Sequence, residues 1–185
     1  QIIKLIKGTF HYRTDIGVEF NYKNSGVDID NYESILHNIK SNITSTYNKN
    51  VQCGFGGFGG VYKISETQSI IQSIDGIGTK SLLSFRYHSK QNLINLGHDI
   101  VANNVNDILV LGAKPITFMD YIGTNKLNSH DLQYIIQGIS ESCKKYNICL
   151  IAGETAEMSS VYKHDNNMEI IGCVTGLLEN NKIIN

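Results

Sequence analysis

Hydrophobic residues recur every three to four positions in two long segments, residues 96–111 and 129–146, and this period predicts two helices. Ser129 is the predicted N-cap of the second helix, and Pro115 is expected to help stop the first. Weaker helical patterns cover residues 28–48 and 81–87. The predicted apolar stripes of the two long helices are Val101, Val105, Ile108 and Leu109, and Leu132, Ile135, Ile136 and Ile139.

Short apolar runs between turn residues predict strands at residues 61–64, 68–74, 116–122, 149–152 and 169–179. The polar turn around Glu66 is too short for a crossover, so the first two strands are predicted to be antiparallel. Helices and strands alternate along the rest of the chain. The expected fold is therefore α/β (α+β), with one mixed sheet and helices packed on one side.

Composition narrows the possible functions. The chain has 185 residues, of which 41% are hydrophobic, enough for one well-buried domain. Its formal net charge of −1 gives no electrostatic reason to expect nucleic-acid binding. The sequence shows neither an apolar run of membrane-spanning length nor the pattern of a signal peptide, so we do not expect a membrane partner. Four cysteines without metal-ligand or redox spacing indicate reduced thiols in a cytoplasmic protein. Because the sequence stops just after a strand, we expect a fragment of a larger enzyme.

The polar face of the helix at residues 96–111 carries short side chains in place of the usual Lys, Glu and Arg. Asp99, Asn103, Asn106 and Asp107 gather on this face, and its two carboxylates lie about two turns apart. Short oxygen ligands suit Mg²⁺ and its phosphate-bound waters. The alternative is a solvated face on which Asp99, near the helix N-terminus, interacts with the helix dipole.

Two glycine-containing segments could bind phosphate. Glycines at positions 54, 56, 57, 59 and 60 would let backbone N–H groups approach an anion, although a flexible turn explains them equally well. In the run Asp75-Gly76-Ile77-Gly78-Thr79-Lys80, the carboxylate suits a metal and the ammonium suits phosphate. A glycine turn with a surface lysine is the alternative for the second segment.

A third segment, residues 153–158, also follows an apolar strand and brings Glu154, Thr155 and Glu157 to the place where open α/β sheets bind ligands. An acidic loop that caps a helix would give the same pattern. His98 could contact a substrate phosphate, with a surface histidine as the alternative. Acidic residues that converge in a folded domain repel one another unless cations neutralise them, so the segments together predict a site for a magnesium nucleotide.

The chain resembles the aminoimidazole ribonucleotide synthetase (phosphoribosylformylglycinamidine cyclo-ligase) family from about residue 21 to the C-terminus. The run Tyr-Lys-Asn-Ser-Gly-Val-Asp-Ile-Asp at residues 22–30 and the run Gly-Glu-Thr-Ala-Glu-Met at residues 153–158 together separate this family from related ATP-using enzymes. Further matching segments are residues 56–60, 75–80, 97–102, 105–107, 112–115 and 120–121.

The resemblance implies a reaction of purine biosynthesis. ATP would phosphorylate the formyl oxygen of formylglycinamidine ribonucleotide, an amidine nitrogen would attack the same carbon, and the imidazole ring would close with release of ADP and phosphate. Lys80 and Asp107 are the implied catalytic residues, and Asp75, Asp107 and Glu154 the implied Mg²⁺ ligands. The residues implied to bind ATP are Gly56, Gly57, Phe58, Gly59, Gly60, Asp75, Gly76, Gly78, Thr79, Lys80, Asp99, Asn106, Gly153, Glu154 and Thr155.

The same resemblance implies a domain plan. Residues 1–20 match nothing, and residues 21–185 correspond to an N-terminal ATP-binding domain that forms a homodimer whose sheets meet in a barrel. The family's C-terminal domain is absent from this sequence, so the chain alone is expected to be inactive. Ser159 replaces a proline of the family pattern, and Asn103 a usually apolar residue. The alternatives are another ATP-using enzyme of the superfamily and a non-catalytic dimerisation module.

Overall fold

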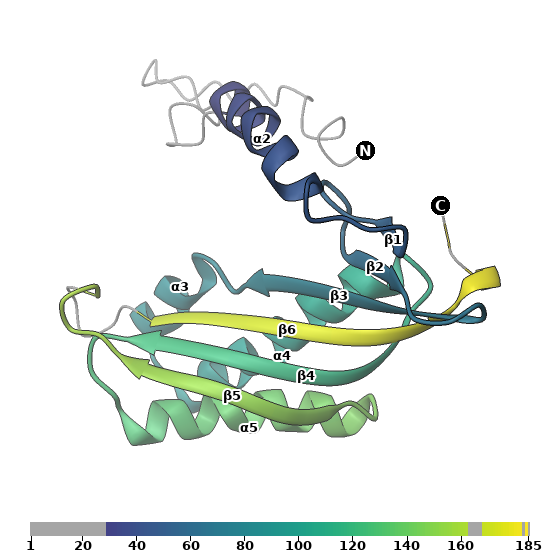
Figure 1. Cartoon of the computed structure of the whole chain (residues 1–185). Helices are drawn as coiled ribbons and strands as arrows, with labels where there is room; N and C mark the ends of the chain where they lie inside the picture. Colours follow the sequence, from purple (N-terminus) through teal and green to yellow (C-terminus); the bar gives the residue numbers. More distant parts are fainter. Residues whose placement is uncertain (1–28, 163–167, 183, 185) are drawn as a thin grey trace, which may run out of the picture. The chain divides into compact units, whose positions relative to one another are not determined.

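The computed structural model describes residues 29–162, 168–182 and 184, with side chains from residue 34 onward (Figure 1). The chain divides into two compact units between Tyr47 and Asn48. The first unit contributes helix α2 (Ile29–Thr44), which confirms the weaker helical pattern predicted there. The N-terminal extension, residues 1–20, and most of the motif at residues 22–30 lie outside the described residues.

The second unit is built on a six-stranded sheet with the strand order β1-β2-β3-β6-β4-β5. Neighbouring strands are antiparallel except for β4 and β5, which are parallel, so the expected mixed sheet is confirmed. The strands are β1 (Val51–Cys53), β2 (Gly60–Lys63), β3 (Gln68–Gly76), β4 (Lys114–Thr124), β5 (Cys149–Glu157) and β6 (Met168–Glu179).

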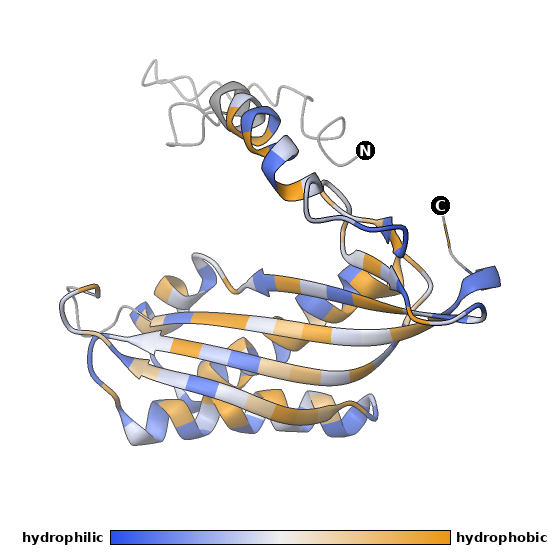
Figure 2. Cartoon of the chain, viewed as in Figure 1, coloured by the Kyte–Doolittle hydropathy of each residue, from blue (hydrophilic) through white to orange (hydrophobic). Residues whose placement is uncertain are grey.

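Helices cover one face of this sheet. Helix α4 (Lys90–Leu109) packs on β3, β6 and β4, and α5 (Ser129–Lys145) packs on α4 and β5 (Figure 1). The short helix α3 (Lys80–Arg86) follows β3, and a 3-10 turn, η1 (Asn180–Lys182), follows β6. Hydrophobic and hydrophilic residues are interspersed along β3 (Figure 2), and it is burial that alternates, because alternate side chains of a strand point to opposite faces. The core side chains with no exposed surface include Ile71, Leu93, Ile100, Phe118, Ile122, Ile135, Ile139, Ile170 and Val174.

The two long helices meet at a pair of glycines. A Cβ atom built on Gly97 of α4 would lie 2.2 Å from the carbonyl oxygen of Ile135, and one on Gly138 of α5 would lie 2.0 Å from that of Ile94. Both distances are too short for any side chain, so the helices touch backbone to backbone. This contact fixes the position of α4 under the sheet without an adjustable side chain between the helices.

Helix α4 differs from its prediction at both ends. It begins at Lys90, because Ser89 caps it by accepting a hydrogen bond from the Asn92 N–H at 3.1 Å. Asp99 therefore lies in the third turn, and the interpretation of Asp99 as an N-terminal dipole residue is wrong. Leu109, assigned above to the apolar stripe, is 47% exposed.

The chain leaves α4 through a glycine and not through a proline. Gly112 has a φ of 86°, its N–H donates to the Leu109 carbonyl, and the Ala113 N–H donates to the Ile108 carbonyl, which is the hydrogen-bond pattern of a Schellman motif. Pro115, predicted to help stop the helix, instead lies in β4.

Two further boundaries were predicted incorrectly. Asn128, and not Ser129, caps α5, because its side-chain oxygen accepts from the N–H groups of His130 and Asp131. Strand β5 continues to Glu157 because it pairs with β4 along this whole segment. The residues at 153–157 are therefore part of a strand and do not follow its end. Within the part of the chain that the structure describes, no helix is both long and apolar enough to cross a membrane.

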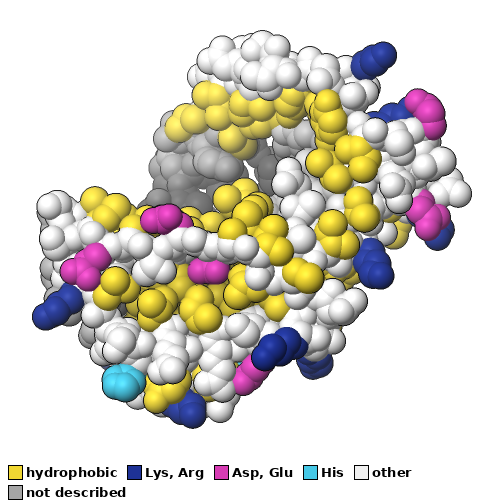
Figure 3. All heavy atoms as spheres, turned by 60° about the horizontal axis from the view of Figure 1, so that its bottom comes forward, with side chains coloured by type: hydrophobic (Ala, Val, Ile, Leu, Met, Phe, Trp, Pro, Cys, Tyr) yellow, Lys and Arg dark blue, Asp and Glu magenta, His cyan; other side chains and the backbone are white. Residues whose placement is uncertain are grey.

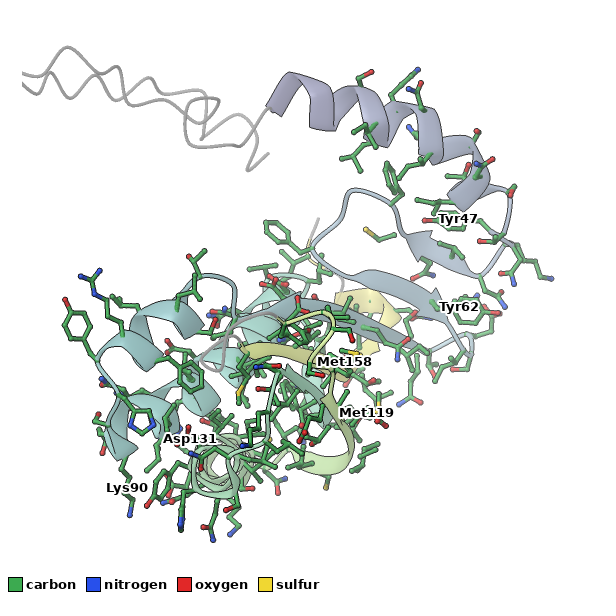
Figure 4. The ribbon with its side chains drawn as sticks, turned by 90° about the vertical axis from the view of Figure 1, so that its left-hand side faces the viewer. Tyr47, Tyr62, Lys90, Met119, Asp131 and Met158 are labelled. Atoms are coloured by element: carbon green, nitrogen blue, oxygen red, sulfur yellow. The ribbon has the colours of Figure 1, made fainter. Side chains whose placement is uncertain are left out.

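The sheet face away from the helices carries apolar side chains that no other element of this unit covers fully. Ile74 on β3 is 71% exposed and Ile151 on β5 is 59% exposed. Figure 3 shows hydrophobic side chains, with acidic ones among them, gathered on the exposed surface of this unit. In Figure 4, Met119 of β4 lies on the side of the sheet opposite Asp131 of α5. Among the described residues of the second unit, this face is therefore open.

Candidate functional site

The carboxyl end of β3 and the start of α3 carry the predicted Asp75–Lys80 segment. Asp75 is the second-last residue of β3, and its Oδ1 accepts a hydrogen bond from the Gly76 N–H at 2.8 Å. Gly78 has a φ of 62°, a left-handed conformation that glycine adopts without steric cost, and Thr79 precedes the first residue of α3, Lys80. The lysine is therefore placed by a helix start directly beyond the strand that carries Asp75.

Lys80 reaches across to α4. Its Nζ lies 3.2 Å from Oδ2 of Asp99, so the structure brings these two predicted site residues together. Both side chains are about half exposed, at 53% and 47%. An ion pair in contact with water contributes little to stability, and either partner can exchange it for another charged group at small cost.

Asp107, eight residues further along α4, is linked to the glycine-rich loop through Ser73 of β3. The Ser73 Oγ lies 2.9 Å from Oδ2 of Asp107 and 3.1 Å from the carbonyl oxygen of Phe58. Ser73 is buried, at 6% exposure, so these contacts are shielded from water. A hydroxyl has a single proton, and it donates to one of the two acceptors at a time.

The glycine-rich loop lies between β1 and β2 and backs onto β3. Gly56 has a φ of 90°, and a Cβ atom on Gly59 would lie 2.9 Å from the Gln72 carbonyl oxygen. The Gly57 N–H is turned back to the Gly54 carbonyl, and Gly60 begins β2. The side chain of Phe58 is 42% exposed. The structure thus brings the loop, the end of β3 and the second half of α4 to one place.

The predicted segment on β5 is separated from this place by two strands. Glu154 pairs with Tyr121 of β4, which pairs with Ile171 of β6, which in turn pairs with Gly76 of β3. Three strand spacings correspond to roughly 14 Å. Glu154 and Asp75 therefore cannot share one Mg²⁺ ion, since this ion holds its oxygen ligands at about 2 Å.

Two neighbours of Glu154 on β5, Gly153 and Glu157, have local contacts. A Cβ atom on Gly153 would lie 2.6 Å from Oδ1 of Asp120, whose pKa is raised by burial. Thr155 is exposed and pairs with Ile122. Glu157 accepts a hydrogen bond from the Leu127 N–H at 3.1 Å. Gly153 and Thr155 thus stay predictions as ATP-binding residues, as do Gly76, Gly78, Thr79 and the exposed Asn106.

The described side chains contain no group of three or more His, Cys, Asp or Glu residues that could hold a metal ion. A protein-only metal cage formed by Asp75, Asp107 and Glu154 is therefore not present in this part of the chain. Mg²⁺ is commonly bound by one or two carboxylates together with substrate phosphates, and the acidic residues of β3 and α4 fit that arrangement.

His98 contacts α5. Its Nδ1 lies 2.8 Å from the Ser142 Oγ, and its Nε2 lies 3.4 Å from Oε2 of Glu141. The predicted alternatives were a phosphate contact and a surface histidine. In the structure this residue connects the two long helices.

Two residues near the site were missed from the sequence. Ser73 and Asn104 are buried polar residues, and each contacts one of the predicted carboxylate residues. Asn104 had a detectable signal, because it occupies the apolar stripe between Ile100 and Ile108 at a spacing of four residues. Ser73 had a weaker one, as a polar residue on the inward-facing side of β3.

The family described as AIR synthase related protein, N-terminal domain, matches residues 56–178. The chain belongs to this family. The matched segment includes the glycine-rich loop, the Asp75–Lys80 turn, α4 and β5.

Several curated relatives are named phosphoribosylformylglycinamidine cyclo-ligase. The relative from Desulfatibacillum aliphaticivorans is 39% identical over 168 residues, which are 89% of this chain and 47% of the relative. The relative from Carboxydothermus hydrogenoformans is 38% identical over 170 residues, which are 90% of this chain and 48% of the relative. The chain spans about half the length of the curated relatives it matches.

The solved structure of T. maritima PurL complexed with ATP matches 72% of this chain and 20% of that chain, with a TM-score of 0.55 and 20% sequence identity. At this identity the likeness shows the fold, and it confirms the predicted fold class.

Proposed function

We propose that this chain is the ATP-binding N-terminal part of a phosphoribosylformylglycinamidine cyclo-ligase. The observation that carries the proposal is the link from Phe58 through Ser73 to Asp107, since it joins two predicted segments, the glycine-rich loop and the polar face of α4, two residues before Asp75 on β3. The names of the relatives support the reaction. Solved T. maritima PurL structures in complex with ATP, ADP and FGAR support a nucleotide as the ligand.

In the proposed reaction, the terminal phosphoryl group of ATP passes to the formyl oxygen of formylglycinamidine ribonucleotide. An amidine nitrogen then attacks the formyl carbon, the C–O bond breaks with phosphate as the leaving group, and the imidazole ring closes. Catalysis of this kind consists of positioning and charge stabilisation and needs no nucleophilic side chain. Lys80 would exchange its ion pair with Asp99 for a phosphate oxygen, and the loop at residues 56–60 would face the phosphates.

Mg²⁺ would neutralise the phosphates in this site. We assign Asp75 and Asp107 as its protein ligands, with Asp99 and Asn106 near the nucleotide or the metal-bound water. Glu154 of the predicted set lies three strand spacings from Gly76, so we propose that Glu154, with Gly153 and Thr155, faces another part of the bound molecules.

Mg-ATP binding to the 185-residue chain tests the nucleotide part of the proposal. We expect millimolar Mg-ATP to raise the melting temperature, by the equivalent of about 3 kcal/mol at one hundred times the dissociation constant. Mg²⁺ alone and ATP with EDTA serve as controls. No stabilisation by Mg-ATP would contradict the proposal.

The substrate class is tested on the same chain saturated with a non-hydrolysable ATP analogue. Formylglycinamidine ribonucleotide should give a further stabilisation that thiamine monophosphate does not give. The reverse preference would favour another enzyme of the superfamily. Stabilisation by neither compound would favour a module without substrate specificity of its own.

We further propose that two copies of the chain associate through the open sheet face and bury Ile74 and Ile151, as the family resemblance implies. Sedimentation equilibrium should give the mass of a dimer for the wild-type chain and of a monomer for Ile74→Lys. A monomeric wild-type chain would contradict this proposal. The family's C-terminal domain would be the second partner of the site, since the relatives are about twice as long as the match.

A further inference from the structure

Asn104 is a polar residue in the apolar stripe of α4. Its exposure is 0%, as is that of Ile100 and Ile108, the residues one turn before and after it. A buried amide without hydrogen-bond partners destabilises a fold, so a native asparagine at such a position needs partners for its polar atoms.

The structure shows these partners. The Asn104 Oδ1 accepts a hydrogen bond from the Asp75 N–H at 3.0 Å. Its Nδ2 donates to the Ile100 carbonyl at 2.9 Å and reaches the Asp75 carbonyl at 3.4 Å. One planar side chain therefore contacts both backbone polar groups of Asp75 and is anchored to its own helix.

The sheet leaves space for this amide. Gly172 of β6 pairs with Asp75, and a Cβ atom on Gly172 would lie 2.5 Å from the Asn104 Nδ2. The contact from α4 thus reaches the backbone of β3 through a gap that a residue with a side chain at position 172 would close.

A second contact between the same two elements lies nearby. Ser73 bonds Asp107, so residues two apart on β3 contact residues three apart on α4. Two such contacts fix both the distance and the rotation of the strand end relative to the helix. The backbone that carries the Asp75 carboxylate is thereby held in register with Asp107.

We propose that Asn104 is a positioning residue: by holding the peptide groups of Asp75, it orients the Asp75 carboxylate toward the magnesium nucleotide. The role of Asp75 in this inference rests on the proposed function, whereas the contact between Asn104 and Asp75 does not. Asn104 itself touches neither nucleotide nor metal.

The test compares Asn104→Ser with two controls in the 185-residue chain. Asn95→Ser makes the same chemical change at an exposed position of the same helix. Ile139→Val removes one buried methyl group from α5, a helix that packs on α4 and β5. This variant controls for a loss of stability alone. Hydrogen exchange of the amides at residues 74–78 and the dissociation constant for Mg-ATP are measured at a temperature where all variants are folded.

Asn104→Ser should speed exchange at Asp75 and weaken Mg-ATP binding, each about tenfold, because the lost hydrogen bonds are worth about 1.4 kcal/mol. Both controls should leave these two quantities within about twofold of the wild type. Unchanged exchange in Asn104→Ser, or equal loosening in Ile139→Val, would overturn the proposal. Faster exchange with unchanged Mg-ATP affinity would mean that Asn104 holds the Asp75 backbone without affecting nucleotide binding, and it would overturn the positioning role.

A wild-type measurement covers the case in which Asn104→Ser does not fold. The Asn104 side-chain amide protons should exchange slowly and show nuclear Overhauser effects to the Asp75 N–H, and fast exchange without these effects would contradict the contact. If the wild-type chain binds no Mg-ATP, the proposed function fails, and the exchange data still decide whether Asn104 holds Asp75.

Discussion

The carboxyl ends of β3 and β5 carry similar sequences and have different surroundings. Each end has an apolar run followed by at least one carboxylate, at least one glycine and a threonine. β3 lies inside the sheet, and Ser73 and Asp75 on it contact α4 through Asp107 and Asn104. β5 lies at the sheet edge, and Glu154 on it is exposed. Both carboxylates are exposed, so the difference lies in the backbone: α4 holds that of Asp75, whereas Glu154 lies on an edge strand.

The largest expected effect comes from disrupting the contact between α4, which packs on β3, and α5, which packs on β5. Gly138→Ala places a methyl group about where the Ile94 carbonyl lies, so α4 and α5 must separate. We expect a loss of about 3 kcal/mol in the free energy of unfolding, measured by urea denaturation. Lys144→Ala, at an exposed position of the same helix, is the control and should change stability by less than about 0.5 kcal/mol. Equal stabilities of the two variants would contradict the backbone contact.

Paired charge removals test the difference between the strand ends directly. Asp107→Asn should weaken Mg-ATP binding about 10- to 100-fold, because the proposed magnesium site loses a charged ligand. Glu154→Gln should change the affinity less than about threefold, since Glu154 lies outside the site proposed for Asp75 and Asp107. Isothermal titration measures both. A larger loss in Glu154→Gln would reverse the assignment.

Removing the Ser73 hydroxyl tests the bracing of β3 without touching a charge. Ser73→Ala leaves the Phe58 carbonyl and the Asp107 carboxylate without their shared donor and should lower the free energy of unfolding by about 1–2 kcal/mol. Exchange at residues 57–60 should accelerate as well. Ser160→Ala, in the exposed turn after β5, is the matched control for stability.

A pH-dependent effect is expected at the end of β5. The Tyr162 hydroxyl donates to Glu169 at 3.0 Å, and partial burial and this carboxylate raise the Tyr162 pKa to about 12 from the usual 10.0. Above pH 10 the unfolded chain loses this proton while the native chain keeps it, so the contribution of Tyr162 to stability falls between about pH 10 and pH 12. Tyr162→Phe should remove this part of the pH dependence in urea denaturation. An identical pH profile of both proteins would contradict the assignment.

The sequence predicted the elements that have a clear hydrophobic period. The stripe Ile135 and Ile139 located α5, and the apolar runs located β3, β4 and β6. The sequence did not predict the ends of elements where a side-chain cap or strand pairing determines the boundary. One example is the start of α4, which Ser89 caps. The extension of β5 to Glu157 depends on hydrogen bonds to β4, a neighbour that the local sequence does not reveal.

For the candidate site, the sequence predicted residues and the structure supplied their contacts. The proximity of Lys80 to Asp99 follows from a helix start placed against α4, which no local pattern contains. Ser73 and Asn104 were missed because one polar residue at an apolar position is a weak signal that does not identify its partner. Their roles depend on the backbone groups they meet from other elements.

The single proton of Ser73 couples two events thermodynamically. While the Phe58 carbonyl accepts it, Asp107 lacks this donor and carries its charge with less compensation, which favours an incoming cation. If the loop withdrew, the proton would be fully available to Asp107. Loop position would therefore be linked to the affinity of Asp107 for the cation proposed to bind there, and by reciprocity that cation would strengthen the hold of β3 on the glycine-rich loop.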